Sequence, residues 1–380
     1  MAKVRCKETA ADSFFGNFLY DQKVSQGHFL RKLNEVIDWA QFTKKLLIYY
    51  KGKGQVGQAP YDPTLILKML LLSYLWNISE RQVEMLANDS LSVGLFLGIG
   101  ANERVPDHAT LTLFKNRLLQ NAGLKVYEAL FHEVVRVAQE QGVKFGQLQI
   151  VDSVHLVADV NITKDRQRQK GGQPPRDKEA DWGVKGDKVV ETIHGVVRKT
   201  AYFYGYKDQV SLNAESGLVT SVVPGNAADY DGHQFQKLVE QDLKKGLDVG
   251  TVAADKGYDD GENHYYLEQQ GINSAIRLKR SRTQKKNAHK EGWLKLIESR
   301  AYQAGLKQRY QIERKFGEAR KWHGFMRCRY TGFIRHGIQS YLTFMALNLK
   351  RLVKLLTGVS FKNDSRGWVR VPMPTACQNR

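Results

Sequence analysis

The sequence has few cysteines, and their spacing offers neither a disulfide framework nor a zinc site. Only three are present, far apart and with no Cys-x-x-Cys pair: Cys6, Cys328 and Cys377. This usage is typical of a protein in a reducing cytosol. Long apolar runs are also missing, because the longest, Leu65–Trp76, is interrupted by Lys68 and is too short to span a bilayer. Residues 1–14 carry charges and no apolar stretch, so we expect no secretory signal and a cytoplasmic location.

The sequence also lacks the short motifs of several enzyme classes. It has no Gly-x-x-x-x-Gly-Lys-Ser/Thr segment, which argues against a phosphate-loop nucleotide hydrolase. Neither Gly-x-Ser-x-Gly nor His-Glu-x-x-His occurs, so the sequence gives no sign of an α/β-hydrolase or a zinc protease. The glycines of the segment 94–100 lack the strand–turn–helix setting of a dinucleotide site.

Acidic residues are scarce at one end of the chain only. Residues 271–380 hold 25 basic and five acidic side chains, whereas residues 1–270 hold 33 basic and 34 acidic ones. All the excess positive charge therefore lies in the last 110 residues. A segregated excess of this kind indicates a polyanionic partner. Nucleic acid fits better than an anionic membrane, because no basic amphipathic helix with a large apolar face is present.

The first part of the chain has the apolar period of helices. Two helix starts are well marked: Asp62-Pro63 supplies an N-cap and an N1 proline, and Ser79 with Gln82 makes a capping box. A longer helical pattern follows Asp107 and is expected to run on to the end of this region. We predict an all-helical N-terminal domain over residues 1–145.

From residue 146 the pattern becomes that of an α/β domain. The predicted order is strand, hairpin, helix, strand, helix, strand and helix, which makes a mixed sheet with flanking helices over residues 146–356. Residues 163–188 are polar and are predicted as an exposed loop, and residues 279–300 as a basic, irregular insertion. Residues 357–380 are predicted as a basic C-terminal tail.

Three acidic residues lie where such a fold would bring them together. Asp152 and Asp255 each end a predicted strand, and carboxylates there project into the crevice where open α/β sheets have their sites. Glu313 lies among basic residues in a helix predicted from about residue 303 to residue 322. Carboxylate oxygens are the ligands that Mg²⁺ prefers. Two such ions about 4 Å apart can activate an attacking oxygen and stabilise a leaving one.

Periodicity alone leaves other interpretations open. An aspartate after a strand is often a turn or N-cap residue, and Glu313 with Arg309 four residues earlier is also typical of a solvated helix pair. Three other acidic residues remain rival ligands: Asp159, Asp208 and Glu318.

A series of short motifs runs through most of the chain. Those of the first region are Ile37-Asp38-Trp39, Tyr61-Asp62-Pro63, Ser79-Glu80-Arg81-Gln82 and Pro106–Leu111. Those of the second are Val151-Asp152-Ser153, Tyr204-Gly205-Tyr206-Lys207 with Gly217-Leu218-Val219, Ala254–Tyr258, and Arg309–Glu313 followed by Phe316-Gly317 and Arg320. In this order and spacing, the motifs resemble those of bacterial insertion-sequence transposases of the DDE class, in the group named after insertion sequence five.

The resemblance implies an RNase H-like catalytic fold in which Asp152, Asp255 and Glu313 are the catalytic residues and hold two Mg²⁺ ions, with Mn²⁺ able to substitute. It also implies a DNA transposase that binds the terminal inverted repeats of an insertion sequence. Such an enzyme cleaves phosphodiesters at the element ends and joins the 3′-hydroxyl ends to target DNA. Two positions depart from the family pattern, because Leu306 replaces a tyrosine and Arg320 replaces a lysine. An arginine can still hold phosphate, as a bidentate fork.

The expected partner is double-stranded DNA, both the terminal repeats and the target, in a nucleoid-associated protein. Basic side chains near Glu313 and in the acid-free stretch 277–290 are expected to contact the DNA: Arg309, Arg320, Lys321, Arg277, Lys279, Arg280, Arg282, Lys285 and Lys286. If about four of the basic residues in the stretch 277–290 touch phosphates, neutralising them should lower the slope of log affinity against log salt concentration by about 3 to 4.

Pairing of two element ends implies a homodimer in the synaptic complex. The N-terminal domain is expected either to read the ends or to pair protomers through its apolar residues, with Leu91, Val93, Leu95 and Phe96 as candidates. Two rival functions also stay open. One is an RNase H-like nuclease or resolvase that cuts without strand transfer, and the other is a catalytically silent DNA-binding regulator.

Overall fold

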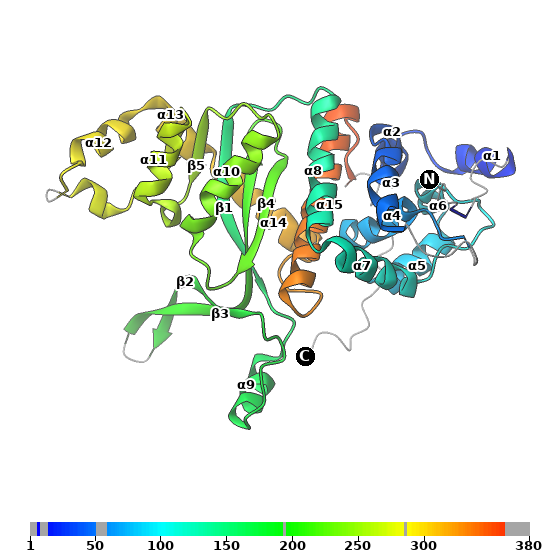
Figure 1. The fold of residues 1–380 in the computed structure, drawn as a ribbon, viewed down its shortest axis with the longest axis horizontal. Helices are drawn as coiled ribbons and strands as arrows, with labels where there is room; N and C mark the ends of the chain where they lie inside the picture. The colour runs from blue at the N-terminus through cyan, green and yellow to red at the C-terminus, as the bar shows by residue number, and fades with distance from the viewer. Residues whose placement is uncertain (1–5, 8–13, 51–58, 193–194, 285–286, 362–380) are drawn as a thin grey trace. The chain divides into compact units, whose positions relative to one another are not determined.

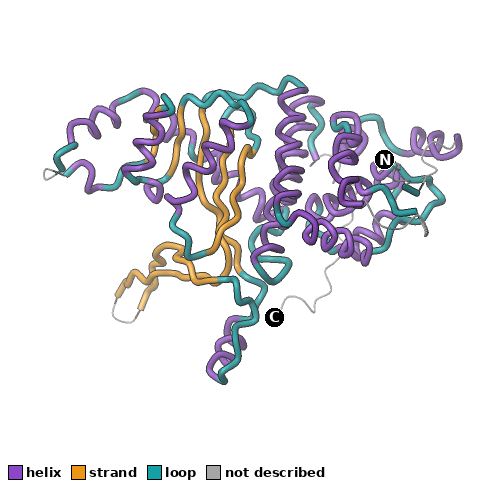
Figure 2. The backbone as a smooth tube through the Cα atoms, viewed as in Figure 1, coloured by secondary structure: helices purple, strands orange, loops and turns teal. Residues whose placement is uncertain are grey.

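The computed structural model describes residues 6–7, 14–50, 59–192, 195–284 and 287–361. By its internal contacts the chain divides into a helical unit, Met1–Val143 with Leu342–Arg380, and a second unit, Lys144–Tyr341, which contains the strands (Figure 2). Most of the predicted tail, from residue 362 onward, lies outside the described residues. Among the helices that the structure describes, none is long and apolar enough to cross a membrane.

The helical unit begins with a series of short helices, in agreement with the sequence pattern. In chain order they are α1 (Phe14–Lys23), α2 (Phe29–Val36), α3 (Trp39–Leu47), α4 (Pro63–Leu75), α5 (Glu80–Asp89), α6 (Leu91–Leu97), α7 (His108–Ala122) and α8 (Lys125–Glu140), with a 3₁₀ turn at Ile48–Tyr50. The end of the long helix α15 (Phe333–Thr357) also belongs to this unit.

Helix α4 is the centre of the helical unit. All of its residues are buried, which is the state expected of a helix that is apolar on every side, and Asp62 caps its first turn as predicted. The one charge in this run, Lys68, is also buried. Its ammonium group donates hydrogen bonds to Asn34 Oδ1 at 3.0 Å and to the carbonyl oxygen of Phe96 at 2.7 Å, and burial lowers the pKa of Lys68 to about 7.

The other predicted helix starts in this unit are confirmed, and one predicted continuation is wrong. Ser79 and Gln82 make both hydrogen bonds of the capping box on α5, and Asp107 accepts a hydrogen bond from the Thr110 amide at the start of α7. The pattern after Asp107 is split into α7 and α8 because Gly123 adopts a positive φ of 60°, which a helix interior does not allow.

The sheet of the second unit has the strand arrangement of the RNase H-like fold, as predicted. Its strands are β1 (Leu148–Val157), β2 (Asp181–Thr192), β3 (Gly195–Asn213), β4 (Val219–Asn226), β5 (Thr251–Ala254) and β6 (Asn273–Ile276). The central order is β4-β3-β1-β5-β6, with antiparallel pairing from β4 to β1 and parallel pairing from β1 to β6. The outer half of β3 pairs only with β2, so these two strands leave the sheet as a ribbon (Figure 1).

Helices cover both faces of this sheet. The helices of the second unit are α9 (Ile162–Lys170), α10 (Phe235–Lys244), α11 (Gly261–Gln269), α12 (Lys290–Glu298), α13 (Arg300–Gln308), α14 (Tyr310–Trp322) and the start of α15. Val252 and Ala254 of β5 belong to a core with residues of α10 and α11, whereas Ala253 between them faces α13. This alternation is the two-residue period of a strand that is buried on both sides.

Two stretches that the sequence predicted as irregular are helical or extended. Residues 163–188 contain α9 and the first half of β2, so the loop prediction was wrong. Asn161 caps α9, and the buried carboxylate of Asp165 accepts a hydrogen bond from the Arg176 amide at 2.8 Å, which fixes the return of the chain. In the basic insertion 279–300, Arg280–Thr283 form a 3₁₀ turn and Lys290–Glu298 form helix α12.

Helix α13 lies unusually close to the sheet because residue 305 has no side chain. A Cβ atom at Gly305 would lie 2.6 Å from the Cβ of Ala275 and 3.4 Å from that of Ala253. We expect Gly305→Ala to lower the free energy of unfolding by about 1 to 3 kcal/mol through overpacking. Gly317→Ala is the matched control, because a Cβ there meets nothing within 4 Å. It should instead raise stability by up to about 1 kcal/mol, as expected for an exposed helix position. Urea unfolding checks both, and equal effects would contradict the packing argument.

Candidate active site

Three carboxylates from separate elements surround the guanidinium group of Arg309. Its Nη2 atom lies 3.0 Å from Asp152 Oδ2 and 3.9 Å from Glu313 Oε1, and its Nη1 atom lies 3.7 Å from Asp255 Oδ1. These are the three acidic residues that the sequence singled out. The structure therefore brings all three within 4.0 Å of one cation.

The sheet topology explains how Asp152 and Asp255 meet. Asp255 follows the last residue of β5, as predicted, and Ala254 is paired with Val151. The prediction that β1 ends at Asp152 was wrong, because β1 continues to Val157 along its antiparallel neighbour β3. Asp152 is nevertheless the first residue of β1 beyond the end of β5, so it lies beside Asp255.

Arg309 and Glu313 come from a helix boundary that the sequence did not predict. The helix expected over residues 303–322 is two helices, α13 and α14, with Arg309 between them. Glu313 then lies in the first turn of α14, one helical turn after Arg309. A carboxylate in this position is favoured by the helix dipole.

The three carboxylates differ in exposure. The side chain of Asp152 is 18% exposed, that of Asp255 is 38% exposed and that of Glu313 is 63% exposed. The pKa of Asp152 is raised to about 6, mainly by burial and to a smaller extent by the negative charge of Asp255, against the opposing effect of Arg309. The shift therefore reflects mainly the loss of water around the Asp152 carboxylate, which disfavours its charged form.

Arg320 contacts a histidine of β1, the strand that carries Asp152. The Nη2 atom of Arg320 donates to Nδ1 of His155 at 3.3 Å. Burial and the charges of Arg320 and Lys185 lower the pKa of His155 to about 4, so its ring is neutral at neutral pH and can accept this bond. The pKa of Arg320 is lowered by burial, against the opposing charge of Asp152. Sequence reasoning missed His155, since no motif or strand-end position marks it.

A buried polar network supports the aspartate edge of the sheet. Tyr258, the last residue of the motif around Asp255, donates its hydroxyl proton to Gln209 of β3. Gln209 in turn donates to Asp231 Oδ1 at 2.7 Å, and Lys207 forms an ion pair with the same oxygen at 2.8 Å. Lys207 and Tyr258 both belong to the sequence motifs, and among the described residues neither forms a hydrogen bond or an ion pair with the three carboxylates around Arg309.

The predicted DNA contacts are spread over exposed and anchored side chains. Arg277 and Arg280 are exposed, and the Lys321 ammonium group lies 4.8 Å from the centre of the Trp322 ring. The Lys279 ammonium group donates to the carbonyl oxygen of Asp259 at 2.9 Å, and the Arg282 guanidinium group donates to the Asp259 carboxylate at 3.0 Å. Lys285 and Lys286 lie outside the described residues.

The rival acidic residues have other partners. Asp159 forms an exposed ion pair with Arg327 at 2.9 Å, and Glu318 pairs with Lys315 at 3.6 Å on α14. Asp208 is fully buried and pairs with His336 at 2.7 Å. Each is therefore accounted for by a contact away from Arg309.

The donor set around Arg309 suits a hard divalent cation by its chemistry. Three carboxylates offer only oxygen ligands, and one guanidinium balances one of their three charges. In the part of the chain that the structure describes, no three His, Cys, Asp or Glu side chains are grouped closely enough to hold a metal ion as they stand. The Arg309 guanidinium lies between the carboxylates instead.

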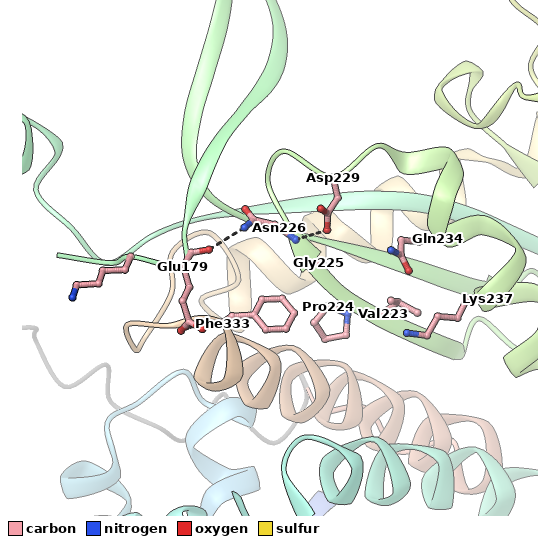
Figure 3. Close-up of a pocket in the computed structure, with 10 residues that line it drawn as sticks. Glu179, Val223, Pro224, Gly225, Asn226, Asp229, Gln234, Lys237 and Phe333 are labelled. Carbon is pink, nitrogen blue, oxygen red and sulfur yellow. Dashed lines mark hydrogen bonds between the residues drawn. The ribbon is translucent and has the colours of Figure 1, made fainter. Parts of the chain in front are cut away.

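A separate cavity lies on the other side of β4 and takes no part in this group. It has a volume of about 470 Å³ and is lined by residues of β4, the turn that follows it, α10 and the start of α15, among them Pro224, Asp229, Lys237 and Phe333 (Figure 3). Asp152, Asp255 and Glu313 are not among its lining residues.

Two protein-family models match the chain. The family model described as "Transposase DDE domain" matches residues 144–349, and the model described as "Transposase domain (DUF772)" matches residues 18–117. Among solved structures, the chain is similar to a piggyBac transposase synaptic complex with hairpin DNA, at 9% identity over 97% of this chain and 86% of that chain, with a TM-score of 0.33. It is also similar to a Mos1 transposase paired-end complex with left transposon end, at 9% identity over 72% of this chain and 83% of that chain, with a TM-score of 0.20.

The strand order identifies the fold of the second unit, and the matched models identify the family. The first of those models covers more than half of the chain and contains all three carboxylates around Arg309. The second accounts for most of the helical unit. The chain therefore belongs to the DDE transposases, with the domain make-up of an insertion-sequence transposase, in a family that generally uses divalent metal ions.

Proposed function

We propose that this protein cleaves DNA at the ends of an insertion sequence and joins the resulting 3′-hydroxyl groups to target DNA. The observation that carries the proposal is the meeting of Asp152, Asp255 and Glu313 around Arg309 in a chain of the DDE transposase family. No covalent enzyme intermediate is needed, since the work of the protein is positioning and charge stabilisation.

In this proposal Asp152, Asp255 and Glu313 hold two Mg²⁺ ions, for which Mn²⁺ can substitute. When bound, the ions supply Lewis-acid activation of the attacking oxygen and stabilise charge on the leaving oxygen. Asp152, the most buried of the three, orients the site from the sheet, because its Oδ1 atom already accepts the Ser153 amide at 2.8 Å. Glu313, the most exposed, faces the side from which DNA arrives.

Arg309 has two roles in the proposed reaction. Without cations it neutralises part of the charge of the carboxylates, as its three ion pairs indicate. With cations and DNA present, its fork of N–H donors can turn to a backbone phosphate, which it matches as well as a carboxylate. Arg320 and Lys321 would hold the DNA backbone further along α14, and the exposed Arg277 and Arg280 would contact it at the start of the basic insertion.

The helical unit is proposed to recognise the element ends or to pair protomers in a synaptic homodimer. The structure limits the second option, because Val93 and Phe96, two of the candidate pairing residues, are fully buried inside the unit. Met85 on α5 and Leu113 on α7 are instead exposed, at 65% and 67%. Double-stranded DNA, as terminal repeats and as target, is the proposed partner.

The test is a reaction with the purified protein, Mg²⁺ and labelled DNA taken from the flanks of its reading frame. We expect nicks at the element ends followed by covalently joined products on a target plasmid, both abolished by a chelator. Cleaved ends without any joined product would replace the proposal with a nuclease or resolvase. Binding of the ends without cleavage in Mg²⁺ or Mn²⁺ would replace it with a silent regulator.

A further inference from the structure

Among the strands that the structure describes, β2 is the one that pairs with the outer half of β3, and the two form a ribbon. From Ala201 to Gly195, β3 pairs with β2 alone, since its pairing with β1 ends at Gly205. Figure 1 shows the ribbon extending away from the sheet, with α9 near its base. A two-stranded ribbon in water is only marginally stable, so a ribbon of this length is expected to be covered when the protein works.

The ribbon exposes large apolar side chains to solvent. Val184 and Tyr202 are opposite each other in the register and are 64% and 62% exposed, and Val189, opposite Arg198, is 64% exposed. Val196 and Val197 are also exposed. Exposed apolar surface of this extent marks an interaction site, and the charges around it indicate which partner it suits.

Those charges are mainly positive. Within residues 162–204, nine of the exposed side chains that the structure describes are basic, whereas only Glu179 and Asp181 are acidic. Three of the basic residues lie on the ribbon, Lys185, Arg198 and Lys199. The helix α9 adds four more: Lys164, Arg166, Arg168 and Lys170. The only acidic residue of α9, Asp165, is buried. This surface is complementary to a polyanion.

The base of the ribbon joins this surface to the candidate active site. The ring of Phe203 lies 4.7 Å from that of His155, the histidine that accepts a hydrogen bond from Arg320. The Arg166 guanidinium of α9 lies 5.1 Å from the centre of the Trp182 ring on β2. The charge of Lys185 contributes to the low pKa of His155. DNA at the carboxylates would therefore pass along the base of the ribbon.

We infer that the β2–β3 ribbon and α9 form a second DNA-binding surface, with the ribbon lying in a groove of the duplex beside the cleavage position. A two-stranded ribbon fits the major groove of B-DNA, where exposed valines can contact thymine methyl groups and lysines can reach phosphates. From Asp152 to Arg198 the path along β1 and β3 is at most about 40 Å, so the contacts fall within about twelve base pairs of the scissile phosphate. The position of the contacts rests on the proposed cleavage site; the binding itself does not.

The test uses full-length protein in a chelator and a fluorescent DNA duplex of arbitrary sequence, about three helical turns long. The variant is Lys185→Gln with Lys199→Gln, and the matched control is Lys237→Gln with Lys244→Gln, two exposed lysines of α10. If both ribbon lysines touch phosphates, the slope of log affinity against log salt should fall by about 1.8 in the variant and stay unchanged in the control.

The outcomes separate this inference from the proposed function. An unchanged slope in the ribbon variant, with normal DNA binding by the wild type, overturns the inference and leaves the proposed function standing. A wild-type protein that does not bind DNA at all overturns the proposed function first. Sedimentation of Val189→Ser tests the competing occupant: loss of a dimer, with an unchanged salt slope in the lysine variant, would assign the ribbon to a second copy of the chain.

Discussion

Replacement of Asp152 by asparagine should abolish DNA cleavage while leaving DNA binding almost intact. The substitution keeps the size of the side chain but removes the charge that Arg309 contacts at 3.0 Å and that the proposed cations require. Several kcal/mol of transition-state stabilisation depend on such ligands, so the rate should fall about a thousandfold or more. Asp255→Asn and Glu313→Gln should behave in the same way. The measurement is the initial rate of nicking at element ends in Mg²⁺.

Asp159→Asn is the control for this series. Asp159 also lies close after β1 and carries an ion pair, but its partner is Arg327 and not Arg309. Its loss should change the cleavage rate by no more than about threefold, since an exposed ion pair contributes little. Retained cleavage and strand transfer in Asp152→Asn, or an equal loss in Asp159→Asn, would contradict the assignment of the three carboxylates.

The largest loss of stability is expected at Asp208, a rival ligand in the sequence that the structure places in the core. Its carboxylate pairs with His336 at 2.7 Å and accepts a hydrogen bond from the Ser340 hydroxyl, and neither Asp208 nor His336 has any exposed surface. Asp208→Ala would leave His336 without its acceptor in the interior. Removing one partner of a buried pair costs about 3 to 5 kcal/mol, and we expect a loss of this size.

Urea unfolding of the full-length protein, followed by circular dichroism, measures this loss. Asp159→Ala is again the matched control, and its exposed pair with Arg327 should contribute less than about 1 kcal/mol. If both substitutions lower the free energy of unfolding by less than about 1 kcal/mol, the buried pair does not stabilise the unit as argued.

Local signals predicted the helix starts, one hairpin and one strand end well. Caps such as Asp62 and the Ser79–Gln82 box act over four residues, so they can be read directly from the sequence. The short apolar run of β5 and the turn between β3 and β4 are equally local signals. This is why these helix starts, the hairpin of β3 and β4 and the position of Asp255 at a strand end agreed with the structure.

The misjudged features depend on distant partners. β1 continues past Asp152 only because β3, more than fifty residues later, pairs with it, and the ion pair of Arg309 with Asp152 joins residues 157 apart in the chain. Residues 163–188 have a polar composition, yet one buried aspartate and one pairing strand give them structure. No local period records such contacts. The motif resemblance supplied what periodicity could not, namely the choice of Asp152, Asp255 and Glu313 over their rivals.

The position of Arg309 also bears on how the second unit folds. Three carboxylates gathered without any cation would repel one another and oppose the docking of α14 against β1. Because Arg309 comes from the same chain, the polypeptide brings its own counter-ion into the group as it folds. We therefore expect this unit to fold without divalent ions, in contrast to small domains whose structure forms only around a metal. In the proposed function, metal loading would replace the guanidinium group between the three carboxylates by divalent cations.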